Sequence, residues 1–259
     1  MTDSISIIQI GMYLSAGLCI GFGAIGPAMG VGTAAGYGVR AMRRQPKQSS
    51  QLLRNMLISQ AVSETPGIFS LVLALIFLFT DATAESENLT SFYGAYAIGA
   101  AYLGGAFAMG VASLGSGAGN GLVASQAVNT MSINPRETSQ TLVTMFIGQA
   151  LGQTPVIFGL LVAFFLKYKI GLAGAIESAA EWSDALIVIG KSIGAGIAMG
   201  AGAIGPAIGI SFVGQSAAKT IGRRIENRSL VMRTLFIGAA VSESTSIYSL
   251  VIALLLIMR

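Results

Sequence analysis

The 259-residue chain contains no histidine and a single cysteine, Cys19. One cysteine cannot form a disulfide within the chain, and without histidine a Cys/His metal site is excluded. Cys19 lies in an apolar, Gly/Ala-rich run, where we expect it to act as a small packing residue. Charged residues make up only 10% of the chain, whereas soluble domains carry roughly 25%. This shortage of charge, together with a mean hydropathy of +0.73, indicates a membrane protein.

Long apolar runs are what the chain has in abundance. A membrane-spanning helix needs about 20 mostly apolar residues. Six such runs follow one another along the chain. The first, third and fifth are rich in Gly and Ala, and the second, fourth and sixth are rich in Leu, Ile, Val and Phe. This alternation predicts an all-α transmembrane fold in which one helical hairpin is used three times. The six predicted spans cover residues 5–42, 51–80, 92–130, 138–167, 183–221 and 229–258.

The three hairpins can be aligned directly. The segment GFGAIGPAMG of hairpin 1 matches GAGAIGPAIG of hairpin 3, and SQAVSETPGIFSLV matches GAAVSESTSIYSLV at the same offset. Hairpin 2 is more diverged, but GVASLGSGAGNG and GQALGQTPVIFGLL align with the same two segments at one fixed offset. We therefore divide the chain into hairpin 1 (residues 1–86), hairpin 2 (87–172) and hairpin 3 (173–259).

Basic residues cluster in the loops after the first and the fifth span. Because positive charge stays on the cytoplasmic side, we expect these turns to be cytoplasmic and both termini to lie on the opposite side. Lys167 and Lys169, on that opposite side, weaken the rule without overturning it. The clustering also argues against a nucleic-acid partner, despite a net charge of +4. The basic residues of the two loops are Arg40, Arg43, Arg44, Lys47 and Arg54, and Lys219, Arg223, Arg224, Arg228 and Arg233.

Glycines recur at four-residue spacing in the odd-numbered spans. Gly26 and Gly30 form one such pair, and Gly205 and Gly209 form the corresponding pair in hairpin 3. Small residues at this spacing let helix backbones approach closely in lipid. One interpretation is ordinary packing within a helix bundle. A more specific interpretation is a closed ring whose inner wall consists of the glycine-rich helices. A nucleotide-binding glycine motif is not supported, because no strand precedes these glycines.

Two carboxylates stand in the middle of apolar spans. Glu64 lies near the centre of the second span, and Glu243 holds the same place in hairpin 3. An ionisable group at a helix centre costs about 2.5–3.5 kcal/mol on insertion scales, and protonation removes much of that cost. Such a group can carry a proton between lipid and a watery channel. Hairpin 2 has Gln153 instead, which cannot release a proton. The alternative is a structural glutamate satisfied by its neighbours.

The residues around the two acids support an ion site. Hydroxyl groups flank both carboxylates, and an amide lies one turn before the first. Pro66 has no backbone N–H, so we expect it to bend the second span and to leave a carbonyl free near the site; hairpin 3 has a threonine at that position. The predicted supporting residues are Gln60, Ser63 and Thr65 in hairpin 1, and Ser242, Ser244, Thr245 and Tyr248 in hairpin 3.

With these motifs the chain resembles the c subunit (proteolipid) of rotary ATP synthases and ATPases, in its F-type form and triplicated. The glycine-rich first helix, the mid-helix carboxylate and the turn Arg44-Gln45-Pro46 carry the resemblance. That turn docks the central stalk in the family. The corresponding SINP and GRRIEN segments are degraded, which puts equal docking by the three hairpins in doubt. Tandem copies that lack one carboxylate are also similar to the proteolipids of V- and A-type ATPases.

The resemblance implies a non-catalytic subunit in a homo-oligomeric rotor ring. Glu64 and Glu243 would take up an ion from a half-channel of the stator, travel past membrane lipid, and release it beside a stator arginine. ATP chemistry would belong to partner subunits, and no cofactor is implied. Sodium-type members carry a glutamine where this chain has Val31 and Ile210, which favours H+ over Na+. The flanking hydroxyls keep Na+ open.

Two other functions fit a polytopic repeat protein. One is a secondary transporter, but such folds usually show inverted repeats and broken helices, whereas these hairpins run in the same direction. The other is a structural proteolipid that forms a ring or pore without catalysis.

Overall fold

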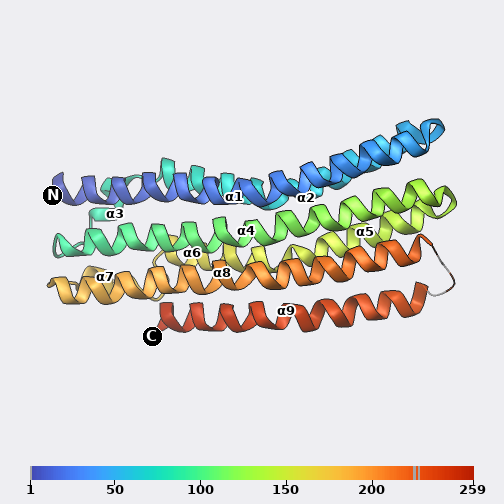
Figure 1. The fold of residues 1–259 in the computed structure, drawn as a ribbon. Helices are drawn as coiled ribbons and strands as arrows, with labels where there is room; N and C mark the ends of the chain where they lie inside the picture. Colours follow the sequence, from blue (N-terminus) through green and yellow to red (C-terminus); the bar gives the residue numbers. More distant parts are fainter. Residues whose placement is uncertain (1, 224–225, 227) are drawn as a thin grey trace.

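The computed structural model describes residues 2–223, 226 and 228–259 (Figure 1). Within these residues the chain forms helices and turns, without strands. Arg224, which belongs to the predicted third hairpin turn, lies outside the described residues, as do residues 225 and 227 of the GRRIEN segment. The long helices are α1 (Thr2–Arg44), α2 (Ser49–Phe79), α4 (Tyr93–Ile133), α5 (Thr138–Gly152), α6 (Thr154–Lys167), α8 (Trp182–Ile221) and α9 (Arg228–Met258). Shorter elements are η1 (Pro46–Gln48), α3 (Ala82–Ser86), η2 (Pro135–Glu137) and α7 (Ala173–Glu177).

The prediction of an all-α membrane protein with six spans is confirmed. Six helical stretches of the described chain are long and apolar enough to cross a bilayer. Within lipid, a helix satisfies its own backbone hydrogen bonds, which is why apolar runs of this length fold as helices. The helix ends lie within three residues of the predicted spans, but the fourth span consists of two helices, α5 and α6, separated at Gln153. The short helices α3 and α7, in the connections between hairpins, were not predicted.

The helices form two rows. The glycine-rich helices α1, α4 and α8 lie side by side, with α4 in the middle (Figure 1). The helices α2, α5–α6 and α9 form the second row, and each packs mainly on the glycine-rich row. The N- and C-termini lie at the end of the bundle that also holds α3 and α7, and the first two hairpin turns, the end of α8 and the start of α9 lie at the other end (Figure 1). The three hairpins therefore run in the same direction.

Glycine allows close contact between α1 and α4. A Cβ atom on Gly30 would overlap the carbonyl of Gly117, and a Cβ on Gly121 would overlap the backbone of Gly30. A Cβ on Gly26 would likewise overlap the backbone of Leu114. Of the predicted packing glycines, Gly26 and Gly30 thus lie in a contact within the chain.

The matching glycines of α8 have different surroundings. A Cβ on Gly209 would overlap the Ser242 hydroxyl of its own hairpin. A Cβ on Gly205 would have no other atom of the described chain within 4 Å. In the repeat, Gly205 corresponds to Gly26. Gly26 is covered by the backbone of α4, whereas Gly205, at the other edge of the bundle, is open.

The first two hairpin turns share one backbone shape despite their different sequences. Gln45 has φ −130° and ψ 70°, and Asn134 has φ −128° and ψ 84°. Each is followed by a proline that begins a short 3-10 helix. The degradation noted for the SINP turn therefore concerns its side chains and not its backbone.

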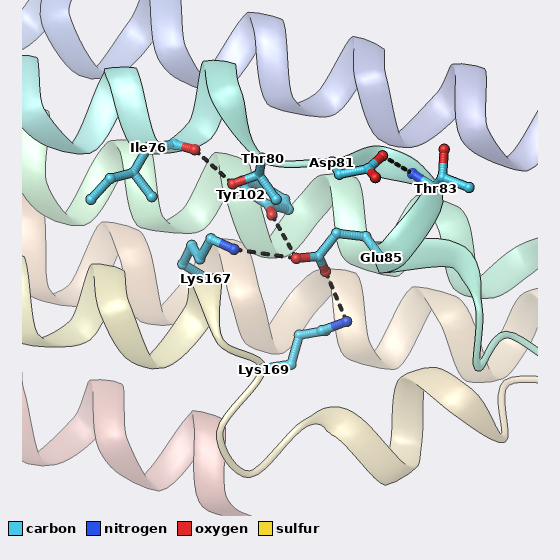
Figure 2. Close-up of polar contacts among 8 residues, drawn as sticks. All are labelled: Ile76, Thr80, Asp81, Thr83, Glu85, Tyr102, Lys167 and Lys169. Atoms are coloured by element: carbon cyan, nitrogen blue, oxygen red, sulfur yellow. Dashed lines mark hydrogen bonds and ion pairs between the residues drawn. The ribbon is translucent and has the colours of Figure 1, made fainter.

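A polar cluster (Figure 2) joins hairpins 1 and 2 around α3, at the end of the bundle that holds the termini in Figure 1. Glu85 of α3 forms ion pairs with Lys167 Nζ at 3.2 Å and with Lys169 Nζ at 2.8 Å. The Tyr102 hydroxyl of α4 donates to Glu85 Oε1 at 3.1 Å. Burial of Glu85 opposes its ionisation, but Lys169 and Lys167 outweigh burial and hold the pKa of the carboxyl below its ordinary value. The two lysines that weakened the charge rule are thus partly neutralised.

Candidate functional site

Glu64 stands at an open edge of the bundle. It lies on α2, in the second row, and its side chain is exposed. It borders a groove of about 560 Å³ between α1 and α2, whose other walls include Pro27, Val31 and Ile68. In the described chain, no hydrogen bond or ion pair of the Glu64 carboxylate is present. The acid thus lies in an apolar setting with nothing to compensate its charge.

Glu243 lies at the matching position on α9, where its side chain is half-buried. Across the described residues its carboxylate also has no hydrogen-bonding or ionic partner. Nearby, Tyr248 is 66% exposed and Val241 is 68% exposed, so this stretch of α9 faces outward. The two acids are therefore placed alike, in the second row, and neither is fixed by a basic group.

Gln153 is fixed where the two acids are free. Its Nε2 atom donates to the carbonyl oxygen of Val62 on α2 at 3.1 Å. That carbonyl has no helical partner, because the residue four positions later is Pro66, which has no N–H. The predicted free carbonyl is therefore present, although α2 runs through Pro66 without interruption. The amide of hairpin 2 uses it to join hairpin 1.

An amide one turn before the acid position links the two helices of a hairpin. Gln60 Nε2 donates to the carbonyl of Val31 on α1 at 3.1 Å. In hairpin 2 the corresponding Gln149 donates to the carbonyl of Asn120 at 3.3 Å. Hairpin 3 has Ala239 at this position, 1% exposed. Gln60 thus holds α2 against α1 beside Glu64, and hairpin 3 lacks this support.

The predicted serine and threonine ligands all donate to backbone carbonyls. Thr65, Ser244 and Thr245 donate to carbonyls of their own helices. Ser242 donates to the carbonyl of Pro206 on α8 at 3.2 Å. Their lone pairs stay available as acceptors, and their role as ion ligands remains a prediction.

Ser63 is turned away from the groove. It is fully buried, donates to the carbonyl of Ser59 at 3.0 Å, and accepts from Gln149 Nε2 at 3.2 Å. Ser63 therefore lies in the contact with hairpin 2, beside Gln149, which the sequence did not predict as a site residue.

Two buried amides were missed from the sequence. Asn120 of α4 and Gln149 of α5 are fully buried. Asn120 stands at the repeat position of Val31 and Ile210, so a position-by-position comparison of the three hairpins could have found it. Gln149 corresponds to Gln60 in the repeat, so the same comparison could have found it as well.

The predicted stalk-docking turn is accessible. Arg44 and Pro46 are exposed, and Gln45 is half-buried. Arg44 Nη1 donates to Asn129 Oδ1 of α4 at 2.6 Å. This bond ties the first hairpin turn to the second hairpin while leaving the turn open to a partner.

Comparison with known proteins gives one family. The profile of the ATP synthase C subunit matches three successive segments, residues 14–77, 103–166 and 193–256. Each segment contains one of the three acid or amide positions.

Three curated relatives are similar to parts of this chain. The ATP synthase c subunit of Thermotoga petrophila is 46% identical over 69 residues, which cover 27% of this chain and 81% of the relative. The ATP synthase c subunit of Alkaliphilus oremlandii is 52% identical over 76 residues, covering 29% and 78%. The chloroplastic ATP synthase c subunit of Tetradesmus obliquus is 44% identical over 79 residues, covering 30% and 96%. A single hairpin of this chain thus matches most of a whole relative.

Proposed function

Because this chain belongs to the family of ATP synthase C subunits, we propose that it is a rotor subunit in which Glu64 and Glu243 carry ions across the membrane. The observation that carries the proposal is the placement of the two acids. They stand at equivalent positions on outward-facing helices, in apolar surroundings, and the amide at the third position is bound instead.

The open edges of the bundle fit a ring of identical chains. Gly26 packs on the backbone of Leu114, and Gly115 packs on the backbone of Ile204 in the same register. Continuing the repeat, Gly205 would pack on Ile25 of the next chain. Ile25 is 47% exposed, and a Cβ on Gly205 would meet nothing nearby in the part of the chain that is described. The glycine-rich helices would then form a continuous inner wall.

The same continuation completes the two ion sites. Since Gln153 of hairpin 2 bonds to the carbonyl of Val62 in hairpin 1, a protonated Glu243 would face Leu151 within its own chain, and Glu64 would face Val241 of the preceding chain. Each site then lies between two neighbouring second-row helices. A neutral, protonated glutamate can pass along the lipid, and a charged one is stable only beside water or the arginine of the stator.

Protons suit these surroundings better than sodium ions. A sodium ion needs several oxygen ligands, whereas the first row carries an apolar side chain at Val31, which lines the Glu64 groove, and at the matching Ile210. The carbonyl of Val31 already accepts the Gln60 amide. Protonation needs only one hydrogen-bond acceptor for the new O–H group. We therefore propose H+ as the transported ion, with Na+ as the alternative.

Two acids in three hairpins change the coupling ratio. A ring of these chains would carry one third fewer ions per turn than a fully acidic ring with the same number of hairpins. Each unit charge that crosses the membrane supplies about 2.3 kcal/mol per 100 mV. Synthesis of ATP would require a larger ion-motive force, and a pump with this rotor could work against a steeper gradient.

Charge and turn geometry suggest how partners meet this rotor. We propose that the hairpin turns are cytoplasmic and that the exposed turn around Arg44, Gln45 and Pro46 docks the central stalk. Both termini would lie on the other side of the membrane. The preserved backbone of the second turn allows hairpin 2 to take part in docking.

Labelling of purified rings with a carbodiimide tests the proposal. Such reagents modify protonated carboxyl groups in lipid, so mass spectrometry should find adducts at Glu64 and Glu243. Protection by Na+ at constant pH would identify a sodium site instead of a proton site. Absence of adducts at both residues under mildly acidic conditions would refute the proposed role.

A further inference from the structure

A group of buried amides lies where the three hairpins meet. Asn120 and Gln149 are 0% exposed. In the described part of the chain, three of their side-chain atoms have no hydrogen-bond partner: Asn120 Oδ1, Asn120 Nδ2 and Gln149 Oε1. A buried amide atom without a partner is destabilising, and native structures contain few of them. So many in one place indicate a site for a small polar molecule.

The group reaches every hairpin. Gln149 Nε2 donates to the Ser59 carbonyl at 3.0 Å and to Ser63 Oγ at 3.2 Å, both in hairpin 1. Ser211 of α8, in hairpin 3, lies against α4, because a Cβ added to Gly119 would overlap its hydroxyl. Ser211 is buried and donates to the carbonyl of Ala207 at 2.8 Å, so its lone pairs can still accept a hydrogen bond.

Beside these buried amides, hairpin 2 has a glycine, Gly152, where the other hairpins have a side chain. The matching residues of the other hairpins are Ser63 and Ser242. A Cβ built on Gly152 would have Asn120 Oδ1 at 3.0 Å and Ser211 Oγ at 3.1 Å as its nearest neighbours. Hairpin 2 therefore lacks one hydroxymethyl group, which is about the size of a water molecule, beside two oxygen atoms.

The backbone around Gly152 is also opened. The helix is interrupted between α5 and α6, and Val156 N–H donates to the carbonyl of Gln153 at 3.1 Å. The Gly152 carbonyl accepts instead from the Ser116 hydroxyl at 2.8 Å. Ser116 stands where the other hairpins carry Pro27 and Pro206. Hairpin 2 thus has polar side chains, Ser116 and Asn120, at positions that are apolar in hairpins 1 and 3.

We propose that this site, bounded by Asn120, Gln149 and Ser211, binds water. Water donates two hydrogen bonds and accepts others, which is what two oxygens and one N–H without partners require. A cation would find oxygen ligands but no negative charge, because Gln153 replaces the acid, and an uncompensated ion is very costly in a buried site. The bound water completes a neutral polar contact that holds the three hairpins together at the level of the ion sites.

A high-resolution electron cryo-microscopy map of the intact assembly tests the proposal directly. We expect density about 3 Å from Asn120 and Gln149, and no such density in an Asn120→Val variant. Valine is the residue of hairpin 1 at this position. A map of the unaltered protein without this density, or with the two amides bonded to each other, would overturn the proposal.

The direction in which Asn120→Val shifts the unfolding temperature provides an independent test. If water satisfies Asn120, its replacement by valine removes hydrogen bonds and lowers the unfolding temperature. If the amide is unsatisfied, valine raises it. Thr144→Val, at a buried hydroxyl that donates to the Gln140 carbonyl, gives the baseline for removing one satisfied polar group. Stabilisation by Asn120→Val would contradict a water site. So would a melting temperature that changes when Na+ replaces K+, measured on the Glu64→Gln, Glu243→Gln double variant with Asn120 retained.

Discussion

Gln153 Nε2 lies 3.1 Å from the carbonyl oxygen of Val62 and donates a hydrogen bond to it across the boundary between hairpins 1 and 2. An amide can keep this bond permanently, since it has no proton to lose. A carboxyl group at the same place could make the bond only while protonated. The amide in place of the acid thus distinguishes the fixed contact of hairpin 2 from the two proposed ion sites at Glu64 and Glu243.

Restoring the acid should create a third ion site. In Gln153→Glu, the new carboxyl would face the Val62 carbonyl that Pro66 leaves without a helical partner. We expect carbodiimide labelling to rise from the proposed two modified residues per chain to three, measured by mass spectrometry of intact chains. Gln153→Leu, which lacks both the proton and the hydrogen bond, serves as the control. Labelling that stays at two in Gln153→Glu would show that hairpin 2 is closed to ions for another reason.

Gly205 of α8 should be needed between chains and not within one. We expect Gly205→Val to leave the single chain folded, because a Cβ there meets no other atom of the described residues within 4 Å. The ring should fail to assemble, because the neighbouring chain would pack on this position. Native gels or mass photometry in detergent would show monomers. Gly174→Val, at another open glycine but in the short helix α7, should leave assembly unchanged. Intact rings of Gly205→Val would rule out the proposed contact.

Gly30→Val provides the opposite case. A Cβ on Gly30 would overlap the Gly117 carbonyl of the same chain, so we expect this variant to misfold as a monomer. Overpacking of a tight contact costs typically about 1–3 kcal/mol and more where backbone is involved. Circular dichroism melts in detergent would show the loss of stability. A Gly30→Val chain as stable as the unaltered one would mean that α1 and α4 do not pack as closely as described.

The repeat made most of this fold predictable. Hydropathy identified six spans, and the fixed offset between hairpins showed that they run in the same direction. The break at Gln153 could not be predicted from Pro155, because α2 carries Pro66 at the same position and continues through it. It depends on tertiary contacts, in particular the Ser116 hydroxyl that satisfies the Gly152 carbonyl.

The candidate site was predictable only in part. Glu64, Glu243 and Gln153 stand out because an acid or its amide in an apolar run is costly and recurs in register. The pairing of Glu85 with Lys167 was not predictable, since 82 residues separate them in the sequence. From the sequence the lysine was only an exception to the charge rule, and its partner became visible with the fold.

The cluster of Glu85, Tyr102, Lys167 and Lys169 should make stability depend on pH in a defined direction. The pKa of the Glu85 carboxyl lies below its ordinary value of 4.5 in the folded chain. Its ion pairs therefore stabilise the fold above the pKa of the unfolded state, and this contribution is lost as the pH falls through the lower folded value. We expect the unfolding temperature to drop on acidification below about pH 4.5, by more than the remaining carboxylates account for.

Glu85→Gln isolates this contribution. The variant leaves Lys167 with 8% side-chain exposure and no carboxylate partner, and loss of a charged hydrogen bond should cost about 2 kcal/mol at neutral pH. Its unfolding temperature should be less sensitive to acid than that of the unaltered chain. Glu87→Gln, at an exposed residue of the same connection, should retain the full acid sensitivity. Equal acid sensitivity in all three proteins would mean that Glu85 does not stabilise the contact between hairpins 1 and 2.

The neighbours of the two acids should give them different reactivity. Glu243 would face the Leu151 carbonyl, which accepts the Thr154 hydroxyl at 3.0 Å but no N–H from the residue four positions later, because that residue is Pro155. Glu64 would face Val241 of the preceding chain, whose carbonyl accepts the matching Ser244 hydroxyl at 2.7 Å and can also accept the helical N–H of Thr245, four residues later. One hydrogen bond more or less is worth about 1 kcal/mol, or roughly a fivefold change in rate or equilibrium. We therefore expect the carbodiimide to modify the two acids of a ring at rates that differ by about this factor. Pro155→Ala, which can supply the missing N–H, should change the rate at Glu243 and leave that at Glu64 unaltered. Identical rates at both acids, before and after this substitution, would show that the freed carbonyl does not take part in the site.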